Sequence, residues 1–128
     1  YDIVMDATDN LHARYLINDA CVKLGKPFVY GSICEFCGQV SVFNYQNGPT
    51  YRDLFEYNDE IENFSQPLGV IGALPGIVGS LQANEAIKII LEKTGVLSGK
   101  LLTIDILNNT YLTFAIRKKG REEESLFK

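Results

Sequence analysis

Polar residues that could bind a metal ion or a phosphate group follow directly on the apolar opening of the chain. They are Asp6, Thr8, Asp9 and Asn10, and Arg14 follows Asn10 by one helical turn. Asp9 can cap a helix, or it can hold Mg²⁺, which prefers one or two carboxylates together with phosphate oxygens. Arg14 can place a positive charge beside a phosphate. The residue types alone leave a helix cap and a ligand site equally open.

Two cysteines have the CxxC spacing, in "CEFC" at 34–37. A zinc site needs a second pair of ligands, and the remaining cysteine, Cys21, lies inside a predicted helix. A redox CxxC pair normally stands at a helix N-terminus, whereas this pair lies in a predicted strand connection. We therefore interpret the cysteines as ordinary thiols, in preference to a redox pair or a zinc site. His12 is interpreted as a solvated helix residue.

The polar residues at positions 6–14 lie within a predicted βαβ unit. Residues 1–8 read as a buried strand, 9–26 as a helix with helical spacing of apolar residues, and 28–33 as a second strand. The two strands are expected to be parallel, because the helical connection returns the chain to the same edge of the sheet. In open α/β sheets ligands collect outside the carboxyl ends of such strands. This favours positions 6–14 as a site.

A strand and a long irregular segment come next. Residues 38–45 alternate as a strand does, and "QNGP" at 46–49 predicts a turn. Residues 50–68 mix aromatic and acidic side chains without a sustained period. Long irregular segments in compact domains are often functional, so we interpret 50–68 as a crossover loop or lid, with a helical turn near 53–57.

The last elements are a helix and a hairpin. Residues 75–94 predict a helix buried on more than one side, in which Gly76, Gly79, Ser80 and Ala83 let another backbone approach closely. Residues 100–107 and 110–117 predict an antiparallel hairpin joined by a two-residue turn, "NN". The expected organisation is one domain over 1–117, followed by a disordered tail over 118–128.

Composition excludes several functional classes. The 128 residues have a net charge of −4, which disfavours nucleic-acid binding, since phosphate backbones attract basic surfaces. No apolar run approaches the roughly 18 residues that a membrane helix needs. Three cysteines and the lack of a signal peptide lead us to expect a cytoplasmic protein without disulfides. The chain starts within a predicted strand, so we expect it to be a piece of something longer.

Three blocks of the sequence together are specific to one family. "DATDNLHARYLINDACVKLGKPFVYGSI", "GQVSVFNY" and "GVIGALPGIVGSLQANEAIK" occur in this order, and the chain resembles the ThiF/MoeB/HesA family, bacterial relatives of ubiquitin-activating enzymes, from residue 1 to about 116. The resemblance implies a Rossmann-like three-layer α/β fold, of which this chain is the C-terminal half, with parallel strands followed by an antiparallel hairpin. It also implies an ATP-dependent adenylyltransferase that activates the C-terminal glycine of a ubiquitin-like sulfur-carrier protein for thiamine or molybdopterin biosynthesis.

The resemblance also implies roles for individual residues. Asp9 matches the family aspartate that handles Mg²⁺ and the ATP phosphates, and Thr8, Asn10 and Arg14 complete this nucleotide edge; Asp9 and Arg14 are the expected catalytic residues. The family's glycine-rich nucleotide loop would precede the "TDN" block and is not in this sequence. We therefore expect the fragment alone to be inactive.

Other departures from the family pattern argue against zinc binding and against cysteine chemistry in the crossover loop. Zinc-bearing members have cysteines where this chain has "TYRD" at 50–53, so no zinc site is expected, and Ser65 stands at the usual cysteine of the crossover loop. These losses support an alternative, a non-catalytic docking or dimerisation partner with the same fold. Family members pair as homodimers, and we expect self-association here as well.

Overall fold

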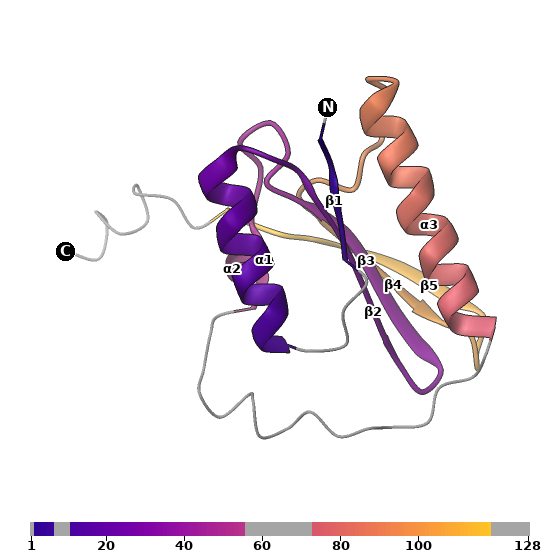
Figure 1. The fold of residues 1–128 in the computed structure, drawn as a ribbon. Helices are drawn as coiled ribbons and strands as arrows, with labels where there is room; N and C mark the ends of the chain where they lie inside the picture. Colours follow the sequence, from indigo (N-terminus) through magenta and orange to yellow (C-terminus); the bar gives the residue numbers. More distant parts are fainter. Residues whose placement is uncertain (1, 7–10, 56–72, 119–128) are drawn as a thin grey trace.

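One mixed sheet separates two helices on one face from a third helix on the other (Figure 1). The computed structural model describes residues 2–6, 11–55 and 73–118. The elements are β1 (Val4–Met5), α1 (Leu11–Leu24), β2 (Phe28–Cys34), β3 (Cys37–Phe43), α2 (Tyr51–Leu54), α3 (Ala73–Ile90), β4 (Lys100–Asp105) and β5 (Thr110–Ala115). The predicted three-layer α/β fold is confirmed.

The strands are ordered β1-β2-β3-β4-β5 across the sheet. β1 runs parallel to β2, with Val4 opposite Phe28, and all later neighbours are antiparallel. The predicted βαβ unit is confirmed, but within the described residues 2–6 the strand has two residues and its Met5 is 41% exposed, so the prediction of a long buried strand was wrong for this part; positions 1, 7 and 8 lie outside the described residues. The reason is that β1 is the edge strand of the described sheet and has a neighbour on one side alone.

Aromatic side chains fill the layer between the sheet and α1 and α2. Tyr15 and Tyr51 meet edge to face with ring centroids 5.0 Å apart, and both rings are buried. The other aromatic members of this cluster are Phe28, Tyr30 and Phe43. The apolar spacing predicted for α1 was partly wrong, because Leu24 is 64% exposed while two polar residues, Arg14 and Asn18, face the sheet. α1 thus carries polar side chains into the interior.

Helix α3 packs closely on the opposite face because two strand positions there are glycine. A Cβ atom at Gly38 would lie 2.7 Å from Val78 Cγ2, and one at Gly31 would overlap the Gln82 side chain. A larger residue at either position would therefore push α3 away from the sheet. Around this contact, the aliphatic side chains of the layer are Val29, Val40, Val42, Leu74, Val78, Ile89 and Ile104.

Helix α3 differs from its prediction in burial and in length. A single stripe faces the sheet (Leu74, Val78, Gln82, Glu85 and Ile89), while Ile87 and Ile90 are more than half exposed. Among the described residues no atom lies within 4 Å of a Cβ built at Gly76 or Gly79, so the close approach expected at these glycines is not found within this part of the chain. No helix in the described ranges has the length and apolar character needed to cross a membrane.

The end of α3 is set by a hydrogen-bonded C-cap. The N–H of Lys93 donates to the Lys88 carbonyl at 2.8 Å, that of Glu92 donates to Ile89 at 3.1 Å, and Glu92 has φ of 55°. This is the Schellman arrangement, with a left-handed residue directly after the helix. The helix therefore ends at Ile90 and not near the predicted stop at Gly95.

The C-terminal hairpin is confirmed, but its turn is longer than predicted. Asp105 pairs with Thr110, which leaves the four residues 106–109 in the loop. One oxygen of the Asp105 carboxylate accepts hydrogen bonds from the backbone N–H groups of Leu107, at 3.0 Å, and Asn108, at 3.3 Å. These bonds compete with strand pairing, so the strands close four residues apart instead of two.

Candidate functional site

Two of the predicted site residues, Asp6 and Arg14, lie just past the end of β1 and beside the middle of β2. Asp6 follows β1 directly, and Arg14 lies in the first turns of α1. Thr8, Asp9 and Asn10, which carry most of the predicted chemistry, lie outside the described residues.

Asp6 and Arg14 form a buried ion pair at this position. Arg14 Nε donates to Asp6 Oδ2 at 2.9 Å, and the two side chains are 8% and 0% exposed, respectively. Arg14 Nη2 also approaches the Gly31 carbonyl oxygen at 3.4 Å. Both residues were predicted at the site, but their pairing was not predicted. Since each charge is matched by the other, the pair is held in one position.

Tyr30 completes the surroundings of the Arg14 guanidinium. The guanidinium carbon lies 5.4 Å from the centre of the Tyr30 ring, within the range of a cation–π contact. Burial raises the pKa of the Tyr30 hydroxyl, and the nearby charge of Arg14 opposes this effect in part. The phenol is therefore protonated at neutral pH, and it donates a 3.0 Å hydrogen bond to Gln39 Oε1.

Gln82 of α3 reaches Asp6 from the other face of the sheet. Its Nε2 donates to the backbone oxygen of Asp6 at 2.9 Å and lies 3.4 Å from that of Val29. Sequence reasoning missed Gln82 because the search for helical periodicity counted apolar residues. The available signal was the spacing of Gln82, which follows Leu74 and Val78 at intervals of four residues and so shares their face of the helix.

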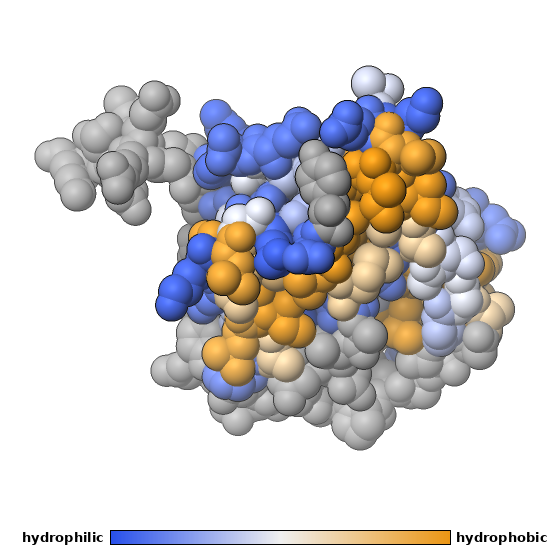
Figure 2. All heavy atoms as spheres, turned by 45° about the horizontal axis from the view of Figure 1, so that its top comes forward, coloured by the Kyte–Doolittle hydropathy of each residue, from blue (hydrophilic) through white to orange (hydrophobic). Residues whose placement is uncertain are grey.

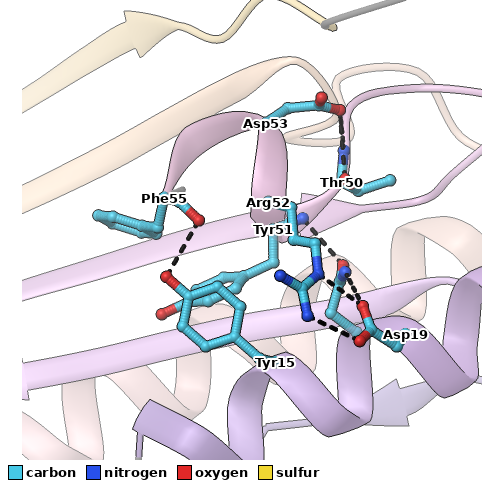
Figure 3. Close-up of polar contacts among 8 residues, drawn as sticks. Tyr15, Asp19, Thr50, Tyr51, Arg52, Asp53 and Phe55 are labelled. Carbon is cyan, nitrogen blue, oxygen red and sulfur yellow. Dashed lines mark hydrogen bonds and ion pairs between the residues drawn. The ribbon is translucent and has the colours of Figure 1, made fainter. Parts of the chain in front are cut away.

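A second polar cluster joins α1 to α2 (Figure 3). Arg52 donates to both carboxylate oxygens of Asp19 at 2.8 Å, and its guanidinium carbon lies 4.9 Å from the centre of the Tyr15 ring. The Tyr15 hydroxyl donates to the Phe55 carbonyl at 3.0 Å, and Asn18 Oδ1 accepts from the Tyr51 N–H at 2.9 Å. These contacts fix the start of the predicted 50–68 loop against α1.

The helical turn predicted near 53–57 is found slightly earlier, as α2. The backbone N–H of Thr50 donates to Asp53 Oδ2 at 2.7 Å, which closes the turn from its N-terminal side (Figure 3). Beyond Phe55 the predicted loop lies outside the described residues, Ser65 included. In the described part, positions 50 and 53 therefore hold the turn through a hydrogen bond between their own atoms.

The CxxC cysteines lie at the tip of the β2–β3 hairpin, as the sequence analysis expected of a strand connection. Cys34 and Cys37 are free and exposed, and Cys21 is free and buried in α1. Across the described residues, no three side chains of the metal-binding types gather closely enough to hold an ion. The side chain of His12 is exposed, as predicted.

Comparison with known proteins gives one family and a set of similar chains. The ThiF family profile matches residues 1–125. The probable molybdopterin-synthase adenylyltransferase of Pyropia yezoensis is 49% identical over 119 residues, which are 91% of this chain and 32% of that protein. The adenylyltransferase and sulfurtransferase MOCS3 of Aedes aegypti is 50% identical over 121 residues, which are 93% of this chain and 28% of that protein. The chain thus spans about a third of the length of these relatives.

Solved structures support the fold. Crystal structures of Escherichia coli MccB with ATP and with MccA-N7isoASN both superpose with a TM-score of 0.76. Their sequence identities are 14% and 13%, and each match covers 92% of this chain and 37% or 39% of the MccB chain. At this identity the likeness concerns the arrangement of helices and strands.

Proposed function

The chain belongs to the ThiF family, and from this membership we propose that it is part of an ATP-dependent adenylyltransferase. The observation that carries the proposal is an identity near 50% over nine-tenths of the chain with relatives named as adenylyltransferases. The proposed substrate is the C-terminal glycine of a ubiquitin-like sulfur-carrier protein. Molybdopterin synthesis is the favoured pathway because it appears in the name of one of these relatives, and thiamine synthesis is the alternative.

The proposed reaction needs positioning more than acid–base chemistry. The carrier carboxylate is ionised at neutral pH and attacks the α-phosphorus of ATP, while pyrophosphate leaves with the electrons of the broken P–O bond. Mg²⁺ would neutralise charge on the phosphates. The donor set of Asp9, Thr8 and Asn10 suits this ion, because a carboxylate, a hydroxyl and an amide oxygen are hard ligands.

Arg14 would act at the same edge as a fixed cation. Its charge is already balanced by Asp6, so a phosphate group beside it would meet a guanidinium whose direction is set by Asp6, Gly31 and Tyr30. A positioned donor stabilises developing charge without reorganising during the reaction. These contacts support the proposed role of Arg14, whereas the role of Asp9 is proposed from the family resemblance.

Further features of the parent protein are part of the proposal. It is expected to be a cytoplasmic homodimer without structural zinc and without a nucleic-acid ligand. Exposed apolar side chains on β1, α1 and α3 support association with further protein surface, and hydrophobic surface is prominent in Figure 2. Examples are Met5, Leu16, Ile87 and Ile90. Sedimentation of the full-length protein at tens of micromolar tests the dimer, and a monomer would contradict it.

The experiment for the activity uses the full-length protein with ATP, Mg²⁺ and candidate carriers. We expect formation of pyrophosphate and carrier adenylate, and a loss of about 100-fold or more in Asp9→Asn, comparable to removing a major electrostatic contact. Asp2→Asn, at an exposed aspartate paired with Lys26, is the matched control and should keep the wild-type rate. If the wild-type protein adenylates no carrier, the proposal fails.

A non-catalytic docking partner is the second candidate. It is favoured by the turn at α2, where Thr50 and Asp53 replace the cysteines that the resemblance implies for zinc-bearing members and bond to each other. For such a protein the Asp9→Asn variant would bind a carrier as the wild type does, and neither form would produce pyrophosphate. Carrier pull-down beside the pyrophosphate assay therefore separates the two candidates.

A further inference from the structure

Cys34 and Cys37 stand directly opposite each other at the end of the β2–β3 hairpin. The strand register pairs the two residues, and Glu35 and Phe36 form the turn between them. Opposite residues of an antiparallel pair project from the same face of the sheet. Both side chains are exposed, so the two thiols share one surface position.

The backbone at this position matches the needs of a disulfide. Opposite Cα atoms in antiparallel pairs are about 4.5–5.5 Å apart, and disulfides join Cα atoms about 4.4–6.8 Å apart. The hairpin tip is held from the side by a 3.0 Å hydrogen bond from the Ile106 N–H to the Phe36 carbonyl. Glu35 has φ of 53°, which keeps the connection to two residues. The fold therefore brings the thiols together before any bond forms.

The pair also projects from the face of the sheet that α1 and α2 cover. Tyr30, Ser32 and Cys34 alternate with residues that face α3, because Gly31 lies under Gln82 and Ile33 packs with the α3 cluster. Cys34 thus projects from the same face as Tyr30, about 13 Å further along β2 at 3.3 Å per residue. By contrast, Cys21 is 2% exposed, and burial raises the pKa of its thiol.

In place of the interpretation as ordinary thiols, we propose that Cys34 and Cys37 are a thiol–disulfide exchange site that reacts with small disulfides of the glutathione class. One thiolate attacks a sulfur of glutathione disulfide, forming a mixed disulfide and releasing one glutathione thiolate. The second cysteine, after losing its proton, attacks the protein sulfur of that mixed disulfide. This closes the Cys34–Cys37 bond and releases the second glutathione, so two protein thiols are oxidised and one glutathione disulfide is reduced to two thiols. The proposal is independent of adenylyl transfer.

The sequence allows the bond to be located by peptide mapping of the full-length protein. Trypsin yields a peptide of residues 24–52 that holds Cys34 and Cys37, while Cys21 falls in the peptide 15–23. Cleavage after Glu35 then divides 24–52 between the two cysteines. An intramolecular disulfide keeps 24–35 and 36–52 joined and lowers the mass of 24–52 by two hydrogens before this cleavage.

The test is a titration with glutathione disulfide at fixed total glutathione, quenched with an alkylating reagent. In the wild type, half of the pair should be oxidised at a certain ratio of glutathione disulfide to glutathione thiol. In Cys34→Ser or Cys37→Ser, glutathionylation of half of the remaining cysteine should need a ratio at least about tenfold higher. The reason is that in the wild type the second thiol is held at a high effective concentration beside the mixed disulfide. Cys21→Ser is the matched control and should titrate like the wild type. Stable glutathione adducts on both wild-type cysteines, bonds between two molecules, or equal ratios for all variants would overturn the proposal.

Discussion

Gln82 and Asp6 are 76 positions apart in the sequence, yet the Gln82 amide donates a 2.9 Å hydrogen bond to the Asp6 carbonyl oxygen. The carboxylate of the same Asp6 binds Arg14 of α1. Helices from the two outer layers therefore meet at one residue, just past the end of β1. In the sequence, this residue stands two positions before the "TDN" block.

Asp6→Asn should destabilise the protein by about 3 kcal/mol, because it leaves the buried Arg14 charge without its counter-ion. Urea unfolding of the full-length protein gives the value. The double variant Asp6→Asn with Arg14→Met is the control, and its loss should be smaller than the sum of the two single losses. Strict additivity would mean that the pair does not couple in solution.

Glu85→Ala should cost about 1–3 kcal/mol, because it leaves a backbone donor without its partner. Glu85 is 2% exposed and accepts from the Leu97 N–H at 2.7 Å and from Lys88 Nζ at 2.6 Å. Glu85→Gln is the matched variant, since its amide oxygen can still accept from Leu97. Hydrogen exchange at the Leu97 amide should accelerate in Glu85→Ala and much less in Glu85→Gln; equal protection in both would argue against this contact.

Gly38→Ala should destabilise by about 1–3 kcal/mol through overpacking, since its new Cβ would stand 2.7 Å from the rigid Val78 side chain. Gly79→Ala provides the opposite control. Gly79 is exposed within α3, and no atom of the described residues lies within 4 Å of the added Cβ, so alanine should stabilise by about 0.8 kcal/mol through helix propensity. Thermal unfolding of both variants should give shifts of opposite sign, and a neutral Gly38→Ala would show that α3 can move outward freely.

The Asp19–Arg52 pair should make stability depend on acid pH. The hydrogen bond from Arg52 is the main cause that lowers the pKa of Asp19, with burial opposing it. The contribution of the ion pair to folding stability is therefore present above the pKa of Asp19 in the unfolded chain, near 3.9. It is lost as the pH falls through the lower pKa of Asp19 in the folded protein. Both side chains are more than two-fifths exposed, so the contribution is below about 1 kcal/mol.

Comparison with Arg52→Gln measures this contribution. The difference in unfolding free energy between wild type and variant should be constant from pH 7 to pH 5 and shrink below pH 4. A part that does not depend on pH should persist, because Arg52 also covers the Tyr15 ring. A difference that grows as the pH falls would reverse the assigned sign.

The regular elements were predictable because their patterns are local. The alternation in 38–45 and the helical spacing after residue 9 need no knowledge of the rest of the fold, and β3 and α1 follow them closely. The limits of elements were less predictable, because they are set by hydrogen bonds between particular atoms. The Glu92 C-cap and the Asp105 carboxylate are the two clear cases.

The polar interior was the part that sequence reasoning did not resolve. Arg14 was assigned to phosphate on the basis of its spacing from Asn10, and no local pattern could reveal that its guanidinium also meets Asp6 and Tyr30. Such contacts depend on which strands neighbour each other, and that is a property of the whole sheet. Position 9, the centre of the proposed site, stays a prediction.

The overlap that a side chain at Gly31 would make with Gln82 has an evolutionary consequence. A larger side chain at position 31 could be tolerated if residue 82 had a shorter side chain. The hydrogen bond to the Asp6 carbonyl would then be lost. Among related sequences, positions 31 and 82 should therefore covary, and a long side chain at 82 should be inherited together with glycine at 31.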